Sequence, residues 1–175
     1  TTNWTNGWNS YYNVPVTPNN VSIIPEGRFA TSVAMGSGHS CAILDNGSVY
    51  CWGNNNAGQL GNGEYPASSS DCSGMGIAGG PGPSNTNWVS WDGTYVNLPS
   101  GRFAITIAAG DEHTCAILDN ASLMCWGDNG HGELGDGTFC SNNQNSDGCL
   151  GISPVKPNPT FVNFSGQSVV SVSLD

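Results

Sequence analysis

Charge is scarce in this sequence, and the few charged residues are strongly biased in sign. Only 9% of the 175 residues are charged, against about 25% in an average globular protein. Three Lys and Arg residues stand against 13 Asp and Glu, which gives a net charge of -10. Nucleic acids and anionic membranes are bound through clusters of Lys and Arg. The composition therefore excludes nucleic acid as a partner and disfavours a membrane surface.

Long apolar runs are also missing. No stretch approaches the ~18 residues of a membrane span, so we expect no membrane insertion. The chain starts with Thr1 and shows no basic-then-apolar signal segment, which predicts a processed or truncated polypeptide. Gly, Asn, Ser and Thr are abundant instead, as is typical of turns and short strands. Seven cysteines in a chain with a single Lys favour an oxidising environment, so we expect an extracellular or cell-surface protein.

An internal repeat organises the sequence. Residues 27–63 and 101–137 align without a gap at an offset of 74, and 22 of the 37 aligned positions are identical. A third copy begins at residue 165 and stops after its first strand. These matches predict four parts: an N-terminal segment that resembles the end of a repeat (1–26), a first repeat (27–100), a second repeat (101–164) and the first strand of a third (165–175).

Each repeat is expected to form an antiparallel β-hairpin. In the first copy, a short strand around Val33 precedes a strand at 39–44, a turn at 45–47 and a strand at 48–52. A three-residue loop that ends in Gly fits a type I turn with a G1 bulge, and it places Cys41 opposite Cys51. Directly opposed residues are close enough for a disulfide. We predict Cys41–Cys51 and, by the same pairing, Cys115–Cys125, each worth about 2–3 kcal/mol.

A zinc site is the alternative interpretation of these cysteines, but nine intervening residues on paired strands do not match the close Cys pairs of such sites. Three cysteines remain. We expect Cys140 to pair with Cys149, which leaves Cys72 either bonded to a neighbouring chain or free.

The repeat motif is specific enough to indicate a family. It reads Gly-x-x-His-[Ser/Thr]-Cys-Ala-Ile-Leu-Asp-Asn, then Cys-Trp-Gly-x-Asn-x-x-Gly-[Gln/Glu]-Leu-Gly-x-Gly, over 36–63 and 110–137. This pattern resembles the repeat of the regulator-of-chromosome-condensation propeller family, and its cysteines are similar to those of secreted and surface members. The resemblance implies four-stranded blades, seven to a ring.

Two repeats are too few for such a ring, and long segments at 65–96 and 139–161 separate the motifs. The predicted fold is therefore all-β: two tandem, disulfide-stapled, blade-like antiparallel repeats with long loop insertions, open rather than closed.

Few residues suggest chemistry. His39 and His113 are the one repeated ionisable pair with catalytic potential, but packing at the strand start with a backbone hydrogen bond is the favoured role. We expect no catalytic residue and no cofactor. Asp128, Glu133 and Asp136 could suggest a calcium loop, yet the first copy has neutral amides there, which are poor substitutes for charged ligands. Turns stabilised by these side chains are the expectation, with no metal site.

Several surface features remain open. Trp88 and Trp91 are candidates for stacking on sugars, with packing between repeats as the alternative. Glycosylation sequons occur at five asparagines, of which Asn46 and Asn120 lie at the predicted hairpin tips; the others are Asn3, Asn20 and Asn163.

The incomplete third copy leads to the functional hypotheses. Its alternating segment, with Val169, Val170, Val172 and Leu174, is predicted to add to the sheet of a neighbouring copy. Such head-to-tail contacts between copies of one chain would build an extracellular, non-enzymatic filament. The alternative is a segment of a larger secreted propeller that binds protein or carbohydrate.

Overall fold

Two four-stranded antiparallel sheets form the described part of the protein. The computed structural model describes residues 23–65, 89–138, 155–165 and 167–174. The first sheet has the order β1-β2-β3-β4 and the second β5-β6-β7-β8. Among the described residues no helix is long and apolar enough to cross a membrane. The strands are β1 (Ala30–Met35), β2 (His39–Leu44), β3 (Val49–Asn54), β4 (Val89–Tyr95), β5 (Ala104–Ala109), β6 (His113–Leu118), β7 (Leu123–Asp128) and β8 (Val155–Phe161).

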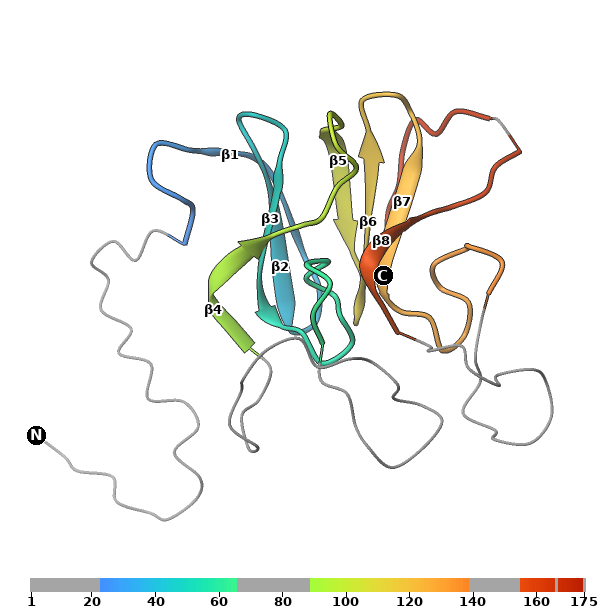
Figure 1. The fold of residues 1–175 in the computed structure, drawn as a ribbon, viewed down its shortest axis with the longest axis horizontal. Coiled ribbons are helices and arrows are strands. Elements are labelled where there is room, and N and C mark those ends of the chain that lie inside the picture. The colour runs from blue at the N-terminus through green and yellow to red at the C-terminus, as the bar shows by residue number, and fades with distance from the viewer. Residues whose placement is uncertain (1–22, 66–88, 139–154, 166, 175) are drawn as a thin grey trace, which may run out of the picture.

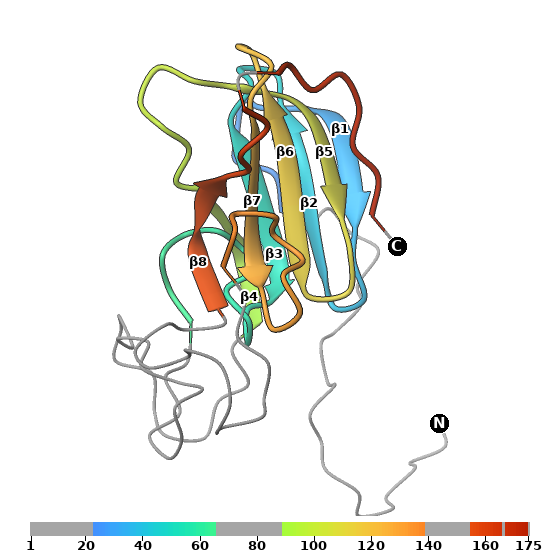
Figure 2. The same ribbon diagram turned by 90° about the vertical axis from the view of Figure 1, so that its right-hand side faces the viewer.

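The sheets stand side by side and repeat one architecture (Figure 1). The first strand of each sheet, β1 or β5, lies at one edge of the molecule, and the fourth strand, β4 or β8, lies at the opposite edge (Figure 2). Nothing in the described residues closes the two sheets into a ring. The expectation of an open, all-β pair of blade-like repeats is confirmed.

The central hairpin of each sheet has the predicted register. Ile43 pairs with Val49 and Cys41 with Cys51, as the turn length requires. In the turn, the Gly47 N–H donates to the Leu44 carbonyl at 2.8 Å, and the Leu44 N–H donates to the Ser48 carbonyl at 2.9 Å. Cys41–Cys51 and Cys115–Cys125 are bonded, each with a Cα–Cα distance of 4.1 Å. The remaining cysteines (Cys72, Cys140 and Cys149) lie outside the described residues.

The second hairpin turn has a strained residue that the first avoids. Gly47 has a φ of +75°, and Ala121 holds the equivalent left-handed conformation at +62°. A left-handed backbone conformation costs an L-residue about 1–2 kcal/mol. Replacement by glycine removes this cost, but part of the gain is lost because glycine makes the unfolded chain more flexible. We therefore expect Ala121→Gly to raise the free energy of unfolding by about 0.5–1 kcal/mol in urea denaturation. Gly47→Ala, the reverse change in the first turn, should lower it; a loss of stability in Ala121→Gly would contradict the strain.

The fourth strands lie at the C-terminal ends of the long segments between the motifs, 65–96 and 139–161. β4 pairs Tyr95 with Tyr50, and β8 pairs Phe161 with Met124. The four-stranded sheets that the family resemblance implies are confirmed, but the positions of their fourth strands were not predicted. The reason is physical: these strands pair across long connections, and β8 contains Pro157 and Pro159, which disfavour a strand assignment except at an edge such as this one.

The hydrophobic core lies between the sheets, in what we call the seam. One face of the first sheet meets the opposite face of the second through twelve buried residues: Cys41, Ile43, Val49, Cys51, Leu60, Val96, Ala104, Ile107, Ala116, Leu118, Met124 and Trp126. The first disulfide therefore lies inside the seam. Docking of the two sheets in the seam supplies much of the burial that a single sheet lacks.

The C-terminal segment, residues 167–174, covers the outer face of the second sheet. Val169, Val172 and Leu174 pack against the cluster that contains the second disulfide, whereas Val170 is 91% exposed. The Val169 N–H donates to the Ala121 carbonyl at 3.0 Å, just as the Ala104 N–H of β5 donates to the Gly47 carbonyl at 2.8 Å. The segment thus occupies on the second sheet the position that β5 occupies on the first sheet. It forms no ladder because the described residues contain no further strand beside it.

Candidate functional site

A hydrogen-bonded network crosses the seam and joins the two repeats. His39 Nε2 lies 2.7 Å from the Thr114 hydroxyl oxygen. That hydroxyl donates to the Gln59 backbone carbonyl at 3.1 Å, and the Trp126 indole N–H donates to the same carbonyl at 2.9 Å. Because the Thr114 proton is used on Gln59, the His39 ring is the donor of the first bond. His39 therefore bonds a side chain of the other repeat, not the backbone of its own.

Burial determines the charge of His39. Its side chain is 3% exposed. Burial, reinforced by the charge of nearby His113, lowers the pKa of His39 to about 4. Nδ1 has no hydrogen-bond partner among the described residues, so a proton added there would be buried without an acceptor. The ring is neutral at physiological pH.

The loop after β3 presents the Gln59 carbonyl to the seam. Asn55, 5% exposed, organises this loop: its Nδ2 donates to the Glu64 carbonyl at 2.7 Å, and its Oδ1 accepts from the Leu60 N–H at 3.0 Å. Gly61 lies so close to Trp126 that an added Cβ would be 2.7 Å from the indole nitrogen. Asn55 and Gly61 of the motif therefore allow the loop of the first repeat to pack against Trp126 of the second.

The outer face of each sheet carries residues that are equivalent to one side of this network. On the first sheet, Ser40 and Trp52 stand at the positions of Thr114 and Trp126, half-buried and without a hydrogen-bond acceptor among the described residues. On the second sheet, His113 and the Glu133 carbonyl are equivalent to His39 and the Gln59 carbonyl, and no other described part of the chain pairs with them as β6 and β7 pair with the first sheet. The unpaired groups of the two outer faces are complementary to each other, as the paired groups are in the seam.

The open half on the second sheet forms a pocket of about 310 Å³, which we call the acidic pocket; it is lined by Asp111, Glu112, His113, Asp128 and Glu133. The equivalent residues of the first sheet are Ser37, Gly38, His39, Asn54 and Gln59. Four neutral positions of the seam are therefore carboxylates here, and only the histidine is retained.

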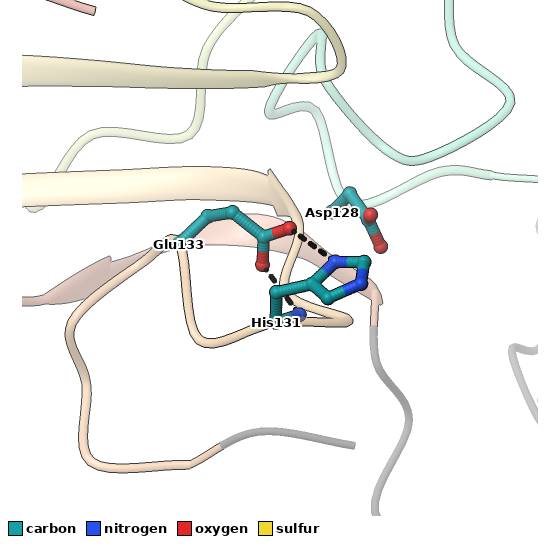
Figure 3. Close-up of side chains that lie close together, drawn as sticks. All are labelled: Asp128, His131 and Glu133. Atoms are coloured by element: carbon teal, nitrogen blue, oxygen red, sulfur yellow. Dashed lines mark hydrogen bonds and ion pairs between the residues drawn. The ribbon is translucent and has the colours of Figure 1, made fainter. Parts of the chain in front are cut away.

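Two of the pocket residues, Asp128 and Glu133, lie close to His131 (Figure 3). One oxygen or nitrogen atom of each side chain, of the kind that could bind a metal ion, lies within 4.8 Å of the other two. The Glu133 carboxylate accepts from the His131 N–H at 2.8 Å and lies 3.1 Å from His131 Nδ1. Burial acts to raise the pKa of Glu133, but hydrogen bonds from its own backbone and from His131 outweigh it and lower that pKa. In the first repeat the Gln59 side-chain oxygen accepts the equivalent N–H, from Ala57, also at 2.8 Å.

The other acidic side chains of the suggested calcium loop also hold turns. Asp128 accepts from the Gly130 N–H at 3.3 Å, and Asp136 accepts from the Thr138 N–H at 2.8 Å. Asn54 and Asn62 make the equivalent bonds to Asn56 and Glu64 in the first repeat. Because neutral amides make the same bonds, loop geometry alone accounts for these carboxylates.

The remaining predicted site residues fall in different places. Asn46 and Asn120 are exposed at hairpin tips, where each side-chain oxygen accepts from the serine hydroxyl of its own sequon at 2.7 Å. Asn163 is exposed and accepts from the Ser165 N–H at 2.9 Å. Asn3, Asn20, Trp88 and the Trp91 side chain lie outside what the structure describes. The seam partners Thr114 and Trp126 were not predicted; only the offset of 74 from Ser40 and Trp52 could have indicated them.

Comparison with known proteins gives three kinds of match: repeat models, curated relatives and solved structures. Two models of the regulator of chromosome condensation (RCC1) repeat match the chain, one at residues 30–59 and 104–133 and the other at 46–117. Together they span residues 30–133, more than half of the chain.

Similar curated proteins are far longer than this chain. Human E3 ubiquitin-protein ligase HERC2 is 31% identical over 70% of this chain and 2% of its own length. A bifunctional serine/threonine-protein kinase/NEDD4-like E3 ubiquitin-protein ligase of Dictyostelium discoideum is 27% identical over 86% of this chain and 7% of its own. Chimpanzee (Pan troglodytes) alsin is 32% identical over 58% and 5%. The chain thus spans a small fraction of these relatives.

Solved structures share the fold. Human WBSCR16 superposes with a TM-score of 0.59 at 18% identity, over 85% of this chain and 30% of that one. A chain from the crystal structure of Kap60 bound to yeast RCC1 (Prp20) gives a TM-score of 0.50 at 20% identity, over 82% and 27%. The matched repeats, the blade-like sheets and the conserved spacing within both copies lead to one conclusion: the chain belongs to the RCC1 repeat family.

Proposed function

We propose that this chain is a protein-binding segment of a larger β-propeller, without enzymatic activity of its own. The observation that carries the proposal is the pair of unfinished faces. One offers the Ser40 hydroxyl and the Trp52 indole, and the other offers the His113 ring and the Glu133 carbonyl, which are equivalent to the groups that join the two repeats in the seam. An exposed apolar face supports it too, since Val33 is 56% and Met35 77% exposed on β1. The position equivalent to Val33 in β5, Ile107, is 8% exposed in the seam.

We further propose an extracellular setting, because two disulfides in so short a chain are typical of oxidising compartments. The family likeness supports the propeller, and it leaves the partner open because the relatives are so much longer than this chain. Protein is favoured over carbohydrate, since the candidate surface is an incomplete sheet face and not an aromatic platform.

Self-assembly into a filament by exchange of the C-terminal strand is the second candidate. The observation in its favour is that residues 167–174 form no ladder with any strand of the described residues. Against it, this segment already packs on the second sheet of its own chain through Val169, Val172 and Leu174, in the position that β5 occupies on the first sheet. Electron microscopy in negative stain distinguishes the two: filaments that disappear when residues 166–175 are deleted would establish exchange, and discrete particles would exclude it.

A fused third repeat tests the propeller segment directly. Residues 169–174 correspond to 104–109, so a copy of residues 110–164 is appended after Leu174. If the outer face is built to receive a sheet, amides of β6 and β7 should exchange at least about tenfold more slowly with deuterium in the longer chain. A matched control replaces the appended copies of Thr114 and Trp126 with Ala. Equal exchange rates in the original, extended and control chains would overturn the proposal.

A further inference from the structure

The acidic pocket marks the part of the second sheet's outer face that residues 167–174 leave uncovered. In the seam, β5 covers the apolar part of the first sheet, while Thr114 of β6 and Trp126 of β7 cover His39 and the Gln59 carbonyl. On the outer face, the C-terminal segment takes the place of β5 and buries the apolar cluster. By the offset between the repeats, the part of this face beside residues 167–174 is equivalent to the part of the first sheet that β6 and β7 cover in the seam.

Charge distinguishes this face from the seam. The first sheet and its loops are neutral at the four positions equivalent to Asp111, Glu112, Asp128 and Glu133 of the pocket. A hairpin that docks here as β6–β7 docks in the seam would bring the ends of its own strands to the same edge, because the strands of both sheets run alike (Figure 2). Like charges at these ends would repel the carboxylates, and cations would be attracted.

A second copy of this chain does not provide such cations. Its three Lys and Arg residues are all held by carboxylates of their own sheet. Arg28 lies 3.0 Å from Asp45, Arg102 lies 2.8 Å from Asp119, and Lys156 lies 3.9 Å from Asp136. With a net charge of -10, two copies repel each other as a whole.

We propose that this face selects a cationic partner: a β-hairpin of a further RCC1-type repeat with Lys or Arg at its strand ends, beside the acidic pocket. The inference rests on the proposed function, that the chain is part of a larger propeller, and it specifies the charge of the hairpin that docks on this face. The hairpin pairs with residues 169–174, donates to the Glu133 carbonyl and places its cations over the carboxylates. The four acidic positions thereby set the order of repeats, since a neutral or acidic hairpin fits the seam but not this face.

Isothermal titration with two hairpin peptides tests the selectivity. Both have the sequence of residues 112–128 and are closed by the Cys115–Cys125 disulfide; one is unchanged, and the other carries Glu112→Lys and Asp128→Lys. At low ionic strength the lysine peptide should bind the full chain about tenfold more tightly, the size expected of one or two surface ion pairs. High ionic strength should remove most of that difference.

The first repeat supplies the matched control. Asp128→Asn with Glu133→Gln in the chain restores the residues found at Asn54 and Gln59, which keep the same loop bonds. This variant should lose most of its preference for the lysine peptide. Equal affinities for the two peptides, tighter binding of the unchanged one, or no binding of either would overturn the inference.

Two further outcomes are informative. Calcium chloride that binds the chain and displaces the lysine peptide would overturn the inference, because the pocket would then be a cation site. The chain with the appended third repeat tests the proposed function separately. If its β6 and β7 amides exchange more slowly but the titration shows no preference for the lysine peptide, the proposed function stands and only the charge selectivity is overturned.

Discussion

Trp126→Ala should lower the free energy of unfolding by about 3–5 kcal/mol, the usual cost of emptying a fully buried aromatic site. The side chain is 0% exposed, fills the centre of the seam and donates to the Gln59 carbonyl. A small domain has only about 5–15 kcal/mol of stability, so this loss is a large share of the total. Urea denaturation followed by circular dichroism measures it.

Trp52→Ala is the matched control, because Trp52 occupies the equivalent position on the outer face. It is half-buried against the cluster of Ala42, Leu44 and Tyr50, and its indole has no acceptor among the described residues. Its replacement should cost less than half as much. Trp126→Phe keeps an aromatic side chain but loses the N–H and the volume of one ring, so its cost should lie between that of the hydrogen bond alone, about 1–2 kcal/mol, and that of Trp126→Ala. Equal losses at Trp52 and Trp126 would mean that the seam does not form as described.

Acid should weaken the seam through His39. The pKa of this histidine falls from 6.5 in the unfolded chain to about 4 in the folded one. Between these values the unfolded state binds more protons than the folded state, so stability falls as the pH falls. The full effect, reached when the pH is lowered from 6.5 to about 4, is up to about 3 kcal/mol.

His39→Gln removes the titrating group and keeps a donor for Thr114. The difference in unfolding free energy between the original chain and this variant should therefore depend on pH within that window and be constant above it. Carboxylates with lowered pKa values, such as Asp136, contribute below the window in both proteins and cancel. His113→Gln should shift the effect to higher pH, because one of the charges that depress the His39 pKa is removed. A difference that is independent of pH would contradict a buried, neutral His39.

Local chemistry determined which parts of the fold could be predicted. The turn at 45–47 fixes a register, and that register brings Cys41 opposite Cys51, so both hairpins and both disulfides were correct in detail. The edge strands β4 and β8 were missed because nothing close in sequence pairs with them. The family motif further predicted blade-like sheets, and the RCC1 matches support that assignment.

The candidate site was harder to predict for the same reason. His39 was expected to bond a backbone group, yet its partner is the side chain of Thr114, 75 residues away. No pattern within one repeat shows which residue of the next repeat will face it. Placing the two copies side by side does show it, because Ser40 and Trp52 are then seen as the unfilled equivalents of Thr114 and Trp126.

The position of the disulfides imposes an order on maturation. Cys41 and Cys51 are both 0% exposed, and the second sheet covers them. Thiol oxidation requires access to the sulfur atoms, and an oxidising enzyme is far too large to enter the closed seam. The Cys41–Cys51 bond must therefore form before the second sheet docks onto the first. Docking then seals the oxidised hairpin, so a reductant reaches this disulfide only after the two sheets separate.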